Sequence, residues 1–517
     1  MISRMLVLWF AFGFLFLFAG CRRQEAHSKR TPPSSGKEVY EMNCAACHGS
    51  NGDGNGPASV WLFPKPRDFS AGMFKIQSTP PGALPTDEDL FNSVTRGLPG
   101  SSMPSFNYLS EQERRLVVQY IKTLTGPVDA SGKHANLFEQ AKLNNRKADP
   151  IHVPPEPPAT IQALDRGKKL FKDLGCVRCH GDTGTGDGPS APTLKDNWGY
   201  PLPPRDFNTG AFRGGPAGKD LYTRIATGLA GTPMPAFGND LVSEDDRWAV
   251  VHYIQSLRRK DIEVNDMLAP PDGTILVQKV KRLPLSPVDP EWEPLETARV
   301  QLNPLWPEAD PIPAVAIRAV HDGRRIAILL QWRDSIADGA PIRIQDFQDA
   351  VAVQFSINGT TPFLGMGDAA NPVNIWQWKA GWQQDLDTGR ADMNSAYPSI
   401  HSDVYPETKP LFRTAEAAGN VLAQPEHASP VEDANAHGFG TMKSQPLKEQ
   451  NVKGKGIWQD GHWNVLLVRE LKSGDADDVR FSKDQPIPVA FAVWDGQNRD
   501  RNGRKVISNW HRLVLEP

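Results

Sequence analysis

The sequence CAACH occupies positions 44–48, and a second copy of the pattern, CVRCH, occupies positions 176–180. Two cysteines three positions apart, with a histidine directly after them, form the attachment motif for c-type haem. The thiols bond to the porphyrin, and the histidine binds the iron. A redox-active dithiol and half of a zinc site are the alternative interpretations. A zinc site requires a second ligand pair nearby, and none follows either copy.

A methionine follows each motif in a loop rich in glycine and proline, Met103 in the first copy and Met234 in the second. A thioether in such a loop is suited to bind the iron opposite the histidine, whereas the alternative is a methionine packed in the core. Paired histidine and methionine ligands close the iron to substrates and favour electron transfer. We therefore predict His48 with Met103, and His180 with Met234, as the two ligand pairs.

The surroundings of the two motifs repeat as well. The methionines are separated by 131 positions and the first cysteines of the motifs by 132 positions. Such a repeat indicates a tandem duplication. The cysteines predicted to hold haem c covalently are Cys44, Cys47, Cys176 and Cys179.

A Pro-Arg-Asp-Phe tetrapeptide also recurs and contains Arg67 and Arg205, each of which is a candidate contact for a haem propionate or part of a structural turn. Residues 36–127 and 161–262 resemble class I cytochromes c, with a first helix, the haem motif, a methionine loop and a closing helix. The resemblance implies two all-α domains with one haem c each. The proline-rich segment 128–160 between them is predicted to be an extended linker.

The N-terminal segment 1–21 has the pattern of an export sequence. An uncharged apolar run follows Arg4 and ends at Cys21, and it is too short to span a membrane comfortably. Small residues before a lone cysteine resemble the cleavage site of bacterial lipoproteins, which implies a lipid on Cys21 and a membrane anchor. Ordinary secretion and an uncleaved anchor are the alternatives. Each predicts an exported protein on the periplasmic side, with residues 22–35 as a flexible tether.

The composition excludes some partners and cofactors. The chain has 517 residues with 57 basic and 60 acidic side chains, and this balance gives no indication of a nucleic-acid surface. Four of its five cysteines belong to the haem motifs. The chain therefore has no cysteine set for an iron–sulfur cluster of its own.

The pattern changes to short strands in residues 263–517. Asp-Gly dipeptides at 322–323 and 460–461 lie between apolar segments, as in β-hairpins. Many short strands separated by turns predict a mainly antiparallel β-sandwich. Residues 383–450 are polar and are predicted to form a long surface insertion.

Parts of this region resemble the haem b-binding γ subunit of ethylbenzene dehydrogenase and related molybdenum enzymes of the dimethyl-sulfoxide-reductase type. The similar stretches are 365–379, 456–463 and 492–510. In that family a β-sandwich holds one haem b between a methionine and a lysine. Met366 matches the methionine, Lys505 in the C-terminal Gly-Arg-Lys segment is our choice for the lysine, and Lys455 is the alternate. A lysine must be neutral to bind iron, so burial has to lower its pKa.

The resemblance implies an electron-transfer subunit with two haems c and one haem b and with no catalytic residue of its own. Its implied partners are a molybdopterin catalytic subunit, an iron–sulfur subunit, and soluble or membrane electron carriers such as a cytochrome c pool. Two alternatives stay open. One is a self-contained dihaem c redox enzyme, which requires an open iron position. The other is a dihaem cytochrome whose haem-free β-sandwich docks to a partner, as the 383–450 insertion allows.

Overall fold

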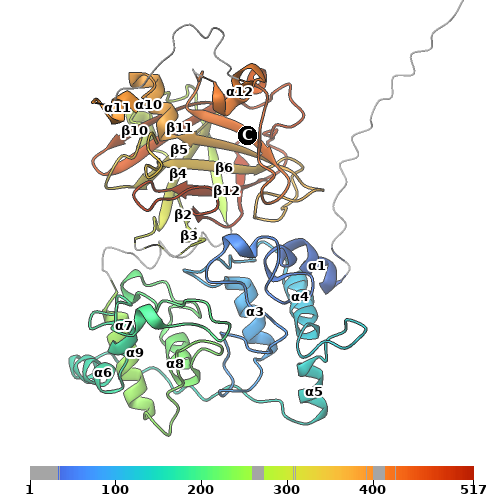
Figure 1. Cartoon of the computed structure of the whole chain (residues 1–517), viewed down its shortest axis with the longest axis vertical. Coiled ribbons are helices and arrows are strands. Elements are labelled where there is room, and N and C mark those ends of the chain that lie inside the picture. Colours follow the sequence, from blue (N-terminus) through green and yellow to red (C-terminus); the bar gives the residue numbers. More distant parts are fainter. Residues whose placement is uncertain are drawn as a thin grey trace, which may run out of the picture. The chain divides into compact units, whose positions relative to one another are not determined.

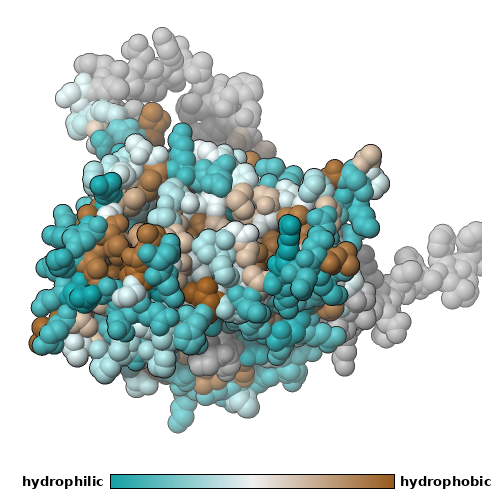
Figure 2. Space-filling view, turned by 90° about the horizontal axis from the view of Figure 1, so that it is seen from below, coloured by the Kyte–Doolittle hydropathy of each residue, from teal (hydrophilic) through white to brown (hydrophobic). Residues whose placement is uncertain are grey.

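The structure is a computed structural model that describes residues 33, 35–258, 273–306, 308, 310–339, 341–391, 393–399, 414–424 and 427–517. The predicted export segment with Cys21, and nearly all of the predicted tether, lie outside these residues. Among the helices it describes, none is both long and apolar enough to cross a membrane. Figure 2 shows a face on which hydrophilic residues predominate and hydrophobic residues form separate patches.

The three longer helices of the first haem-motif copy begin at Ser35, Thr86 and Ser110, whose side chains each accept a backbone N–H. The Ser110 hydroxyl accepts the Glu113 backbone N–H, and the Glu113 carboxylate accepts the Ser110 N–H, which forms a capping box. The helices are α1 (Gly36–Asn43), α2 (Ala45–His48), η1 (Ser59–Trp61), α3 (Asp87–Arg96) and α4 (Glu111–Thr123). All are blue to cyan in Figure 1.

The second copy repeats this arrangement. In each copy, the first helix contacts the last helix closely at a glycine. A side chain in place of Gly36 on α1 would collide with the Leu116 carbonyl of α4, and one in place of Gly167 would collide with the Ala249 carbonyl. Glycine lets the first and last helices of each copy approach closely. The helices are α6 (Ile161–Asp173), α7 (Val177–His180), η2 (Ala191–Thr193), η3 (Phe207–Thr209), α8 (Gly218–Thr227) and α9 (Glu244–Ser256).

The segment 128–160 is not simply extended, as its proline content led us to expect. It contains α5 (Leu137–Leu143), and the Phe138 ring lies 6.0 Å from the Phe74 ring, centroid to centroid. His134 in the same segment is buried. The N-terminal half of this linker is therefore packed against the first copy.

The C-terminal region forms one hydrogen-bonded sheet, for which 14 strands lie in the described residues. Its strands are β1 (Thr274–Lys279), β2 (Ala298–Gln301), β3 (Asn303–Pro304), β4 (Ala314–His321), β5 (Arg325–Arg333), β6 (Ala350–Ser356), β7 (Val373–Lys379), β8 (Val431–Ala436), β9 (Lys443–Ser444), β10 (Lys453–Gln459), β11 (His462–Glu470), β12 (Ile487–Trp494), β13 (Val506–Ile507) and β14 (His511–Leu515). β1 pairs in parallel with β14 and β4, and the other pairs are antiparallel, which confirms the mainly antiparallel prediction. Both predicted hairpins, β4–β5 and β10–β11, are present.

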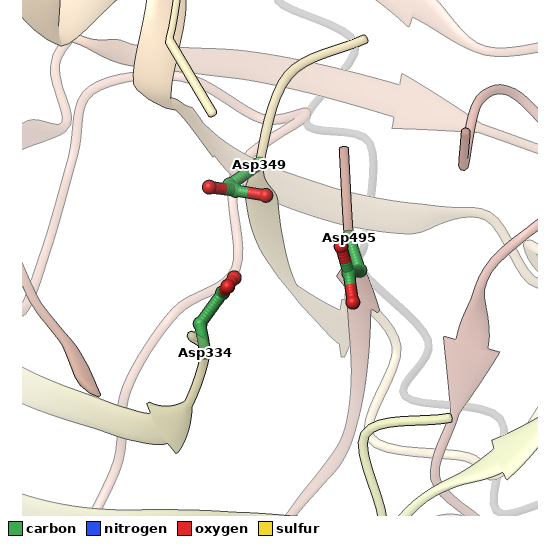
Figure 3. A group of neighbouring side chains, drawn as sticks. All are labelled: Asp334, Asp349 and Asp495. Atoms are coloured by element: carbon green, nitrogen blue, oxygen red, sulfur yellow. The ribbon is translucent and has the colours of Figure 1, made fainter. Parts of the chain in front are cut away.

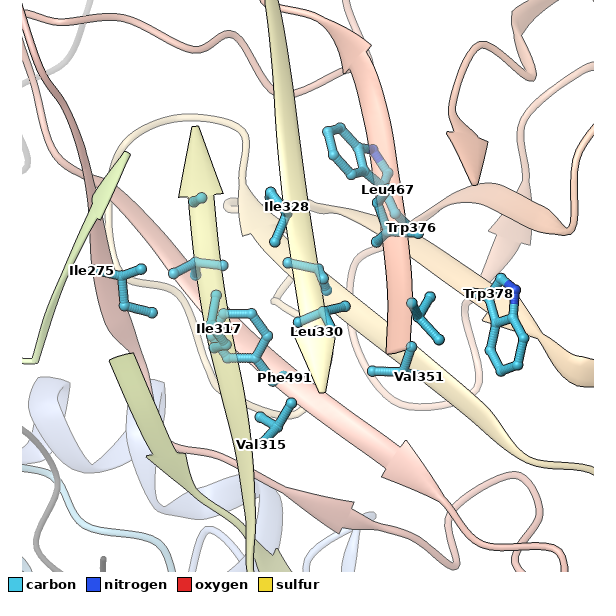
Figure 4. Packing of buried hydrophobic residues seen from close by; sticks show 14 of the residues in the cluster. Ile275, Val315, Ile317, Ile328, Leu330, Val351, Trp376, Trp378, Leu467 and Phe491 are labelled. Atoms are coloured by element: carbon cyan, nitrogen blue, oxygen red, sulfur yellow. The ribbon is translucent and has the colours of Figure 1, made fainter. Parts of the chain in front are cut away.

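The sheet folds over a shared apolar core. Trp332 on β5 and Trp378 on β7 belong to strands that are not neighbours in the sheet, yet their rings lie 6.4 Å apart, centroid to centroid. Trp463 on β11 lies 4.8 Å from Trp378. Figure 4 shows aliphatic side chains of β4, β5 and β6 pointing into the same core. This is the packing of a sandwich.

The prediction that residues 383–450 form a long surface insertion is wrong in part. Residues 431–436 form β8, which is buried and pairs with both β7 and β9. Its Glu432 and Asp433 made the stretch look like a loop, but both are buried and paired with partners on β7. The remaining helices are η5 (Pro290–Trp292), α10 (Ala380–Thr388), α11 (Met393–Ala396), α12 (Thr414–Ala417), η6 (Val421–Ala423) and η7 (Leu447–Glu449).

Candidate haem sites

The first haem motif forms a single helical turn directly after α1. The His48 N–H donates to the Cys44 carbonyl at 2.9 Å, and Gly49 ends the turn with φ 77°. Cys44 and Cys47 are free thiols, and burial raises the pKa of each to about 12. Neither thiol is consumed by a disulfide, so both remain able to form the thioether bonds of haem c.

His48 is held in the state that binds iron. Its Nδ1 lies 2.9 Å from the Arg67 carbonyl oxygen, and its ring stacks on Phe69 at 4.5 Å. Burial lowers the pKa of His48 to about 4. A neutral imidazole that donates from Nδ1 leaves Nε2 as the ligand atom.

The methionine loop is closed by backbone hydrogen bonds. The Leu98 N–H donates to the Met103 carbonyl at 3.0 Å, and the Ser101 hydroxyl donates to the Leu98 carbonyl at 2.7 Å. Met103 packs against the core of the first copy as a partly buried side chain. The loop therefore fixes the backbone of the predicted distal ligand.

The second copy has matching geometry. Nδ1 of His180 lies 3.3 Å from the Arg205 carbonyl, and the ring stacks on Phe207 at 4.3 Å. Burial lowers the pKa of His180. The Leu229 N–H donates to the Met234 carbonyl at 3.2 Å, as in the first loop. Both cysteines of this motif are free as well.

Met366 lies in a strained turn before β7. Its φ is 71°, although it is not a glycine, and the Gly438 N–H donates to its carbonyl at 2.8 Å. A non-glycine residue in this region costs about 1 kcal/mol or more and persists where surrounding structure fixes it. This backbone strain could not be predicted from the sequence. The φ of 71° fixes the direction in which the backbone holds the Met366 side chain.

Lys505 is a partly buried lysine for which the described residues supply no carboxylate partner. Its Nζ lies 4.6 Å from the centroid of the Trp494 ring, and burial lowers its pKa to about 8. Lys379, by contrast, has its Nζ 2.5 Å from the Glu432 carboxylate. The alternate Lys455 is exposed on β10. The structure thus gives Lys505 the environment that a neutral amine ligand needs.

One cavity of about 800 Å³ brings the two predicted sites together. It is lined by all four residues predicted to hold the first haem c, and also by Met366 and Lys505. Cavities of this size hold cofactor-sized ligands. The free thiols and the neutral imidazole of the first haem motif fit a haem c in the part of the cavity that they line. Met366 and Lys505 fit a haem b in the part that they line. Lys455 does not line this cavity.

The first haem-motif copy and the β-sandwich both line the cavity because hydrogen bonds hold them together. The Phe63 N–H donates to the Leu305 carbonyl at 3.0 Å, and the Ser105 N–H donates to the Asn509 side-chain oxygen at 3.1 Å. Tyr108 of the first copy also packs against an apolar cluster of the sandwich. These contacts join segments that are far apart in the sequence.

The two arginines of the repeated tetrapeptide reach across to the other copy. The Arg67 guanidinium lies 4.1 Å from the Trp198 ring centroid and 3.4 Å from the Ala230 carbonyl, beside the second methionine loop. Arg205 donates to the Gly100 carbonyl of the first methionine loop at 3.3 Å. Each copy thus uses its arginine to donate a hydrogen bond to the methionine loop of the other copy, and these two contacts join the copies. Arg67 also lines the cavity, whereas Arg205 does not.

A group of buried carboxylates was not predicted from the sequence. Asp334, Asp349 and Asp495 come from three separate segments, and their oxygens approach within 4.8 Å of one another (Figure 3). Burial, together with the charge of neighbouring carboxylates, raises the pKa of Asp349 to about 8 and that of Asp334 to about 6. Asp349 accepts the Trp463 indole N–H at 2.9 Å, which ties the group to the core.

Comparison with protein families assigns most of the described chain. Residues 34–125 and 164–258 match the model of the cytochrome c family, and residues 289–506 match the model of the ethylbenzene dehydrogenase family. The two cytochrome matches contain the two haem motifs, and the third match contains Met366 and Lys505.

Three curated relatives are similar to part of the chain. A protein described as a respiratory nitrate reductase haem subunit in Haloferax mediterranei is 27% identical over 207 residues, 40% of this chain and 57% of that protein. The chlorate reductase γ subunit of Ideonella dechloratans is 27% identical over 203 residues, 38% of this chain and 64% of that protein. The dimethylsulfide dehydrogenase γ subunit of Rhodovulum sulfidophilum is 26% identical over 280 residues, 49% of this chain and 85% of that protein. The chain therefore spans less than two thirds of the first two relatives.

Proposed function

This chain joins two cytochrome c domains to a domain of the ethylbenzene dehydrogenase family, and we propose that it is the γ-type electron-transfer subunit of a molybdoenzyme complex. The similarity to γ subunits of chlorate reductase and dimethylsulfide dehydrogenase supports this assignment. A molybdopterin subunit and an iron–sulfur subunit would be its partners on one side. A cytochrome c pool or the respiratory chain would be its partner on the other.

The observation that carries the proposal is the cavity shared by the first cytochrome c domain and the β-sandwich. Bound haems would carry single electrons between the two oxidation states of iron. His48 and Met103 would close one iron to substrates, and Lys505 and Met366 would do the same for haem b. Because one cavity holds both ligand sets, the electron path would run from the sandwich through the first cytochrome c domain to the second, or in the reverse direction.

The two alternative functions each require a feature that the structure does not favour. A self-contained enzyme needs an iron with no sixth ligand. Each copy instead has a methionine, Met103 or Met234, in a loop that is closed by the same backbone hydrogen bond. A haem-free docking sandwich leaves Lys505 partly buried, with no carboxylate partner among the described residues and with its pKa lowered to about 8. Removing a cation from water without such a partner costs free energy. Both observations support the electron-transfer subunit.

Haem quantitation on the matured protein tests the proposal. A pyridine haemochrome spectrum combined with acid–acetone extraction separates covalent haem c from extractable haem b. We expect two haems c and one haem b per chain, together with molybdenum in the co-purified complex. Two haems c and no haem b, from cells that supply haem b, would leave the sandwich as a docking module.

We also propose that the protein is exported and anchored by a lipid on Cys21. The export of haem c proteins and the small residues before Cys21 support this part of the proposal. Replacement of Cys21 by alanine should move the protein from the membrane fraction to the soluble periplasmic fraction. An unchanged membrane fraction would contradict the lipid anchor.

A further inference from the structure

Lys75 and Arg213 are two of the basic side chains on the cavity wall. Lys75 belongs to the first cytochrome c domain, directly after the buried Phe74. Arg213 belongs to the second domain, between η3 and α8, yet it lines the same cavity as the first haem motif. A residue of one domain therefore reaches the predicted haem site of the other.

Neither cation has a carboxylate within ion-pair distance among the described residues. The Arg213 Nε is buried and has no hydrogen-bond partner there. Burial, together with the charge of Arg205, lowers the pKa of Arg213 to about 10. Burial lowers the pKa of Lys75 well below its usual value, and the charges of Arg213 and Arg67 contribute to this shift. Partly buried cations that repel one another are stabilised by an anion between them.

The acidic side chains of the described residues do not supply this anion. Asp196 is the acid whose charge acts on Lys75 and Arg67, but it forms no ion pair with either. The cross-domain arginines are better satisfied, since the Arg205 guanidinium donates to the carbonyls of Ala211 and Gly100. Lys65 and Arg501, which also line the cavity, donate to the carbonyls of Ser59 and Arg499. Lys75 and Arg213 are therefore the cations available to an anionic ligand that enters the cavity.

We propose that Lys75 and Arg213 bind the propionate carboxylates of the haem held by His48, so that the second cytochrome c domain completes the haem site of the first. This inference rests on the proposed haem content of the first domain. Propionates are the anionic groups of haem, and guanidinium pairs with carboxylates in a planar, two-bond geometry. Cations at the propionates disfavour the additional positive charge of ferric iron, so they raise the reduction potential of that haem.

Potentiometric titration of the full haem-loaded chain tests the proposal. Lys75→Gln and Arg213→Gln should each lower the midpoint potential of the first haem, and Arg213→Lys, which keeps the charge, should restore most of it. Lys172→Gln is the matched control, because Lys172 is an exposed cation of the second domain. A Met234→His background, which lowers the potential of the second haem, identifies the component that moves.

The outcomes separate this inference from the proposed function. Unchanged first-haem potentials in both glutamine variants, with both haems c present, would overturn the inference alone. A shift confined to the second haem in Arg213→Gln would overturn the contact across domains. Absence of covalent haem in the unmodified chain would overturn the proposed function itself. If Arg213→Gln does not mature, Lys75→Gln and Arg213→Lys still provide the test.

Discussion

The Lys505 ammonium nitrogen lies 4.6 Å from the centroid of the Trp494 ring. The indole face stabilises the charged form by a cation–π contact, but burial dominates and lowers the pKa of Lys505 to about 8. The lysine is therefore still mostly protonated at neutral pH, but it loses its proton far more readily than an ordinary lysine. Such a lysine can become an iron ligand at small cost once a haem enters.

Replacement of Lys505 by alanine should remove haem b and leave both haems c in place. Loss of a well-placed partner at a metal site lowers affinity by about 10- to 100-fold, and a direct ligand should cost at least as much. Extractable haem measured per covalent haem checks this. Lys455→Ala, at an exposed position on β10, is the control and should keep its haem b. Equal haem b in both variants would contradict the assignment.

Met366 offers a test that separates ligation from packing. Met366→Gly should lower haem b affinity. It should change the stability of the haem-free fold little, because glycine relieves about 1 kcal/mol of strain at the φ of 71°, whereas the side chain loses its packing against an apolar cluster of the sandwich. Denaturant titration and haem quantitation measure the two effects. Met442, which lines the same cavity, is the control position. A Met366→Gly protein with full haem b would show that the methionine only packs.

The carboxylate group predicts a loss of stability as the pH rises from about 4 to about 8. The folded-state pKa of Asp349 is raised to about 8, above the ordinary value near 4, so the folded state binds the proton more tightly. The stabilisation is fully present below about pH 4 and is lost as the pH rises toward 8. The expected observation is a melting temperature that falls between pH 5 and pH 8.

Asp334→Asn should reduce this pH dependence. One Asp334 oxygen accepts the Ile336 N–H at 3.1 Å, and the other is buried without a hydrogen-bond partner, so an amide fits the site. Each pKa unit corresponds to about 1.4 kcal/mol, and the variant should be more stable than the parent at pH 8 by an amount of that order. A pH profile identical to that of the parent protein would exclude this carboxylate group as the cause.

The contact between Arg67 and Trp198 should contribute to the docking of the two cytochrome c domains. A desolvated cation–π contact is worth about 0.5–2 kcal/mol, so Trp198→Ala should lower the unfolding temperature of the second domain in calorimetry. Tyr200→Ala, two positions away at an exposed site, is the comparison. Identical calorimetric profiles for the two variants would show that the contact adds nothing.

The sequence predicted those features that depend on neighbouring residues. The haem motifs and the hairpin turns at 322–323 and 460–461 all depend on residues within a few positions of one another. The strand β8 was missed because its buried Glu432 and Asp433 have the composition of a loop, and only their partners on β7 make burial favourable.

The shared cavity and the carboxylate group could not be predicted in this way. Both depend on segments that the fold brings together from distant parts of the chain, such as Asp334, Asp349 and Asp495 on three separate segments. The short helix α5 was missed for a related reason, since seven residues form a stable helix mainly through packing such as that of Phe138 on Phe74.

The shared cavity is lined by the first cytochrome c domain and the β-sandwich, with Arg213 from the second cytochrome c domain, and this has a consequence for haem exchange. The hydrogen bonds from Phe63 to Leu305 and from Ser105 to Asn509 hold the first domain against the sandwich. Because that domain forms part of the cavity wall, it should slow the departure of a non-covalent haem. The sandwich expressed alone should therefore exchange haem b faster than the whole chain does.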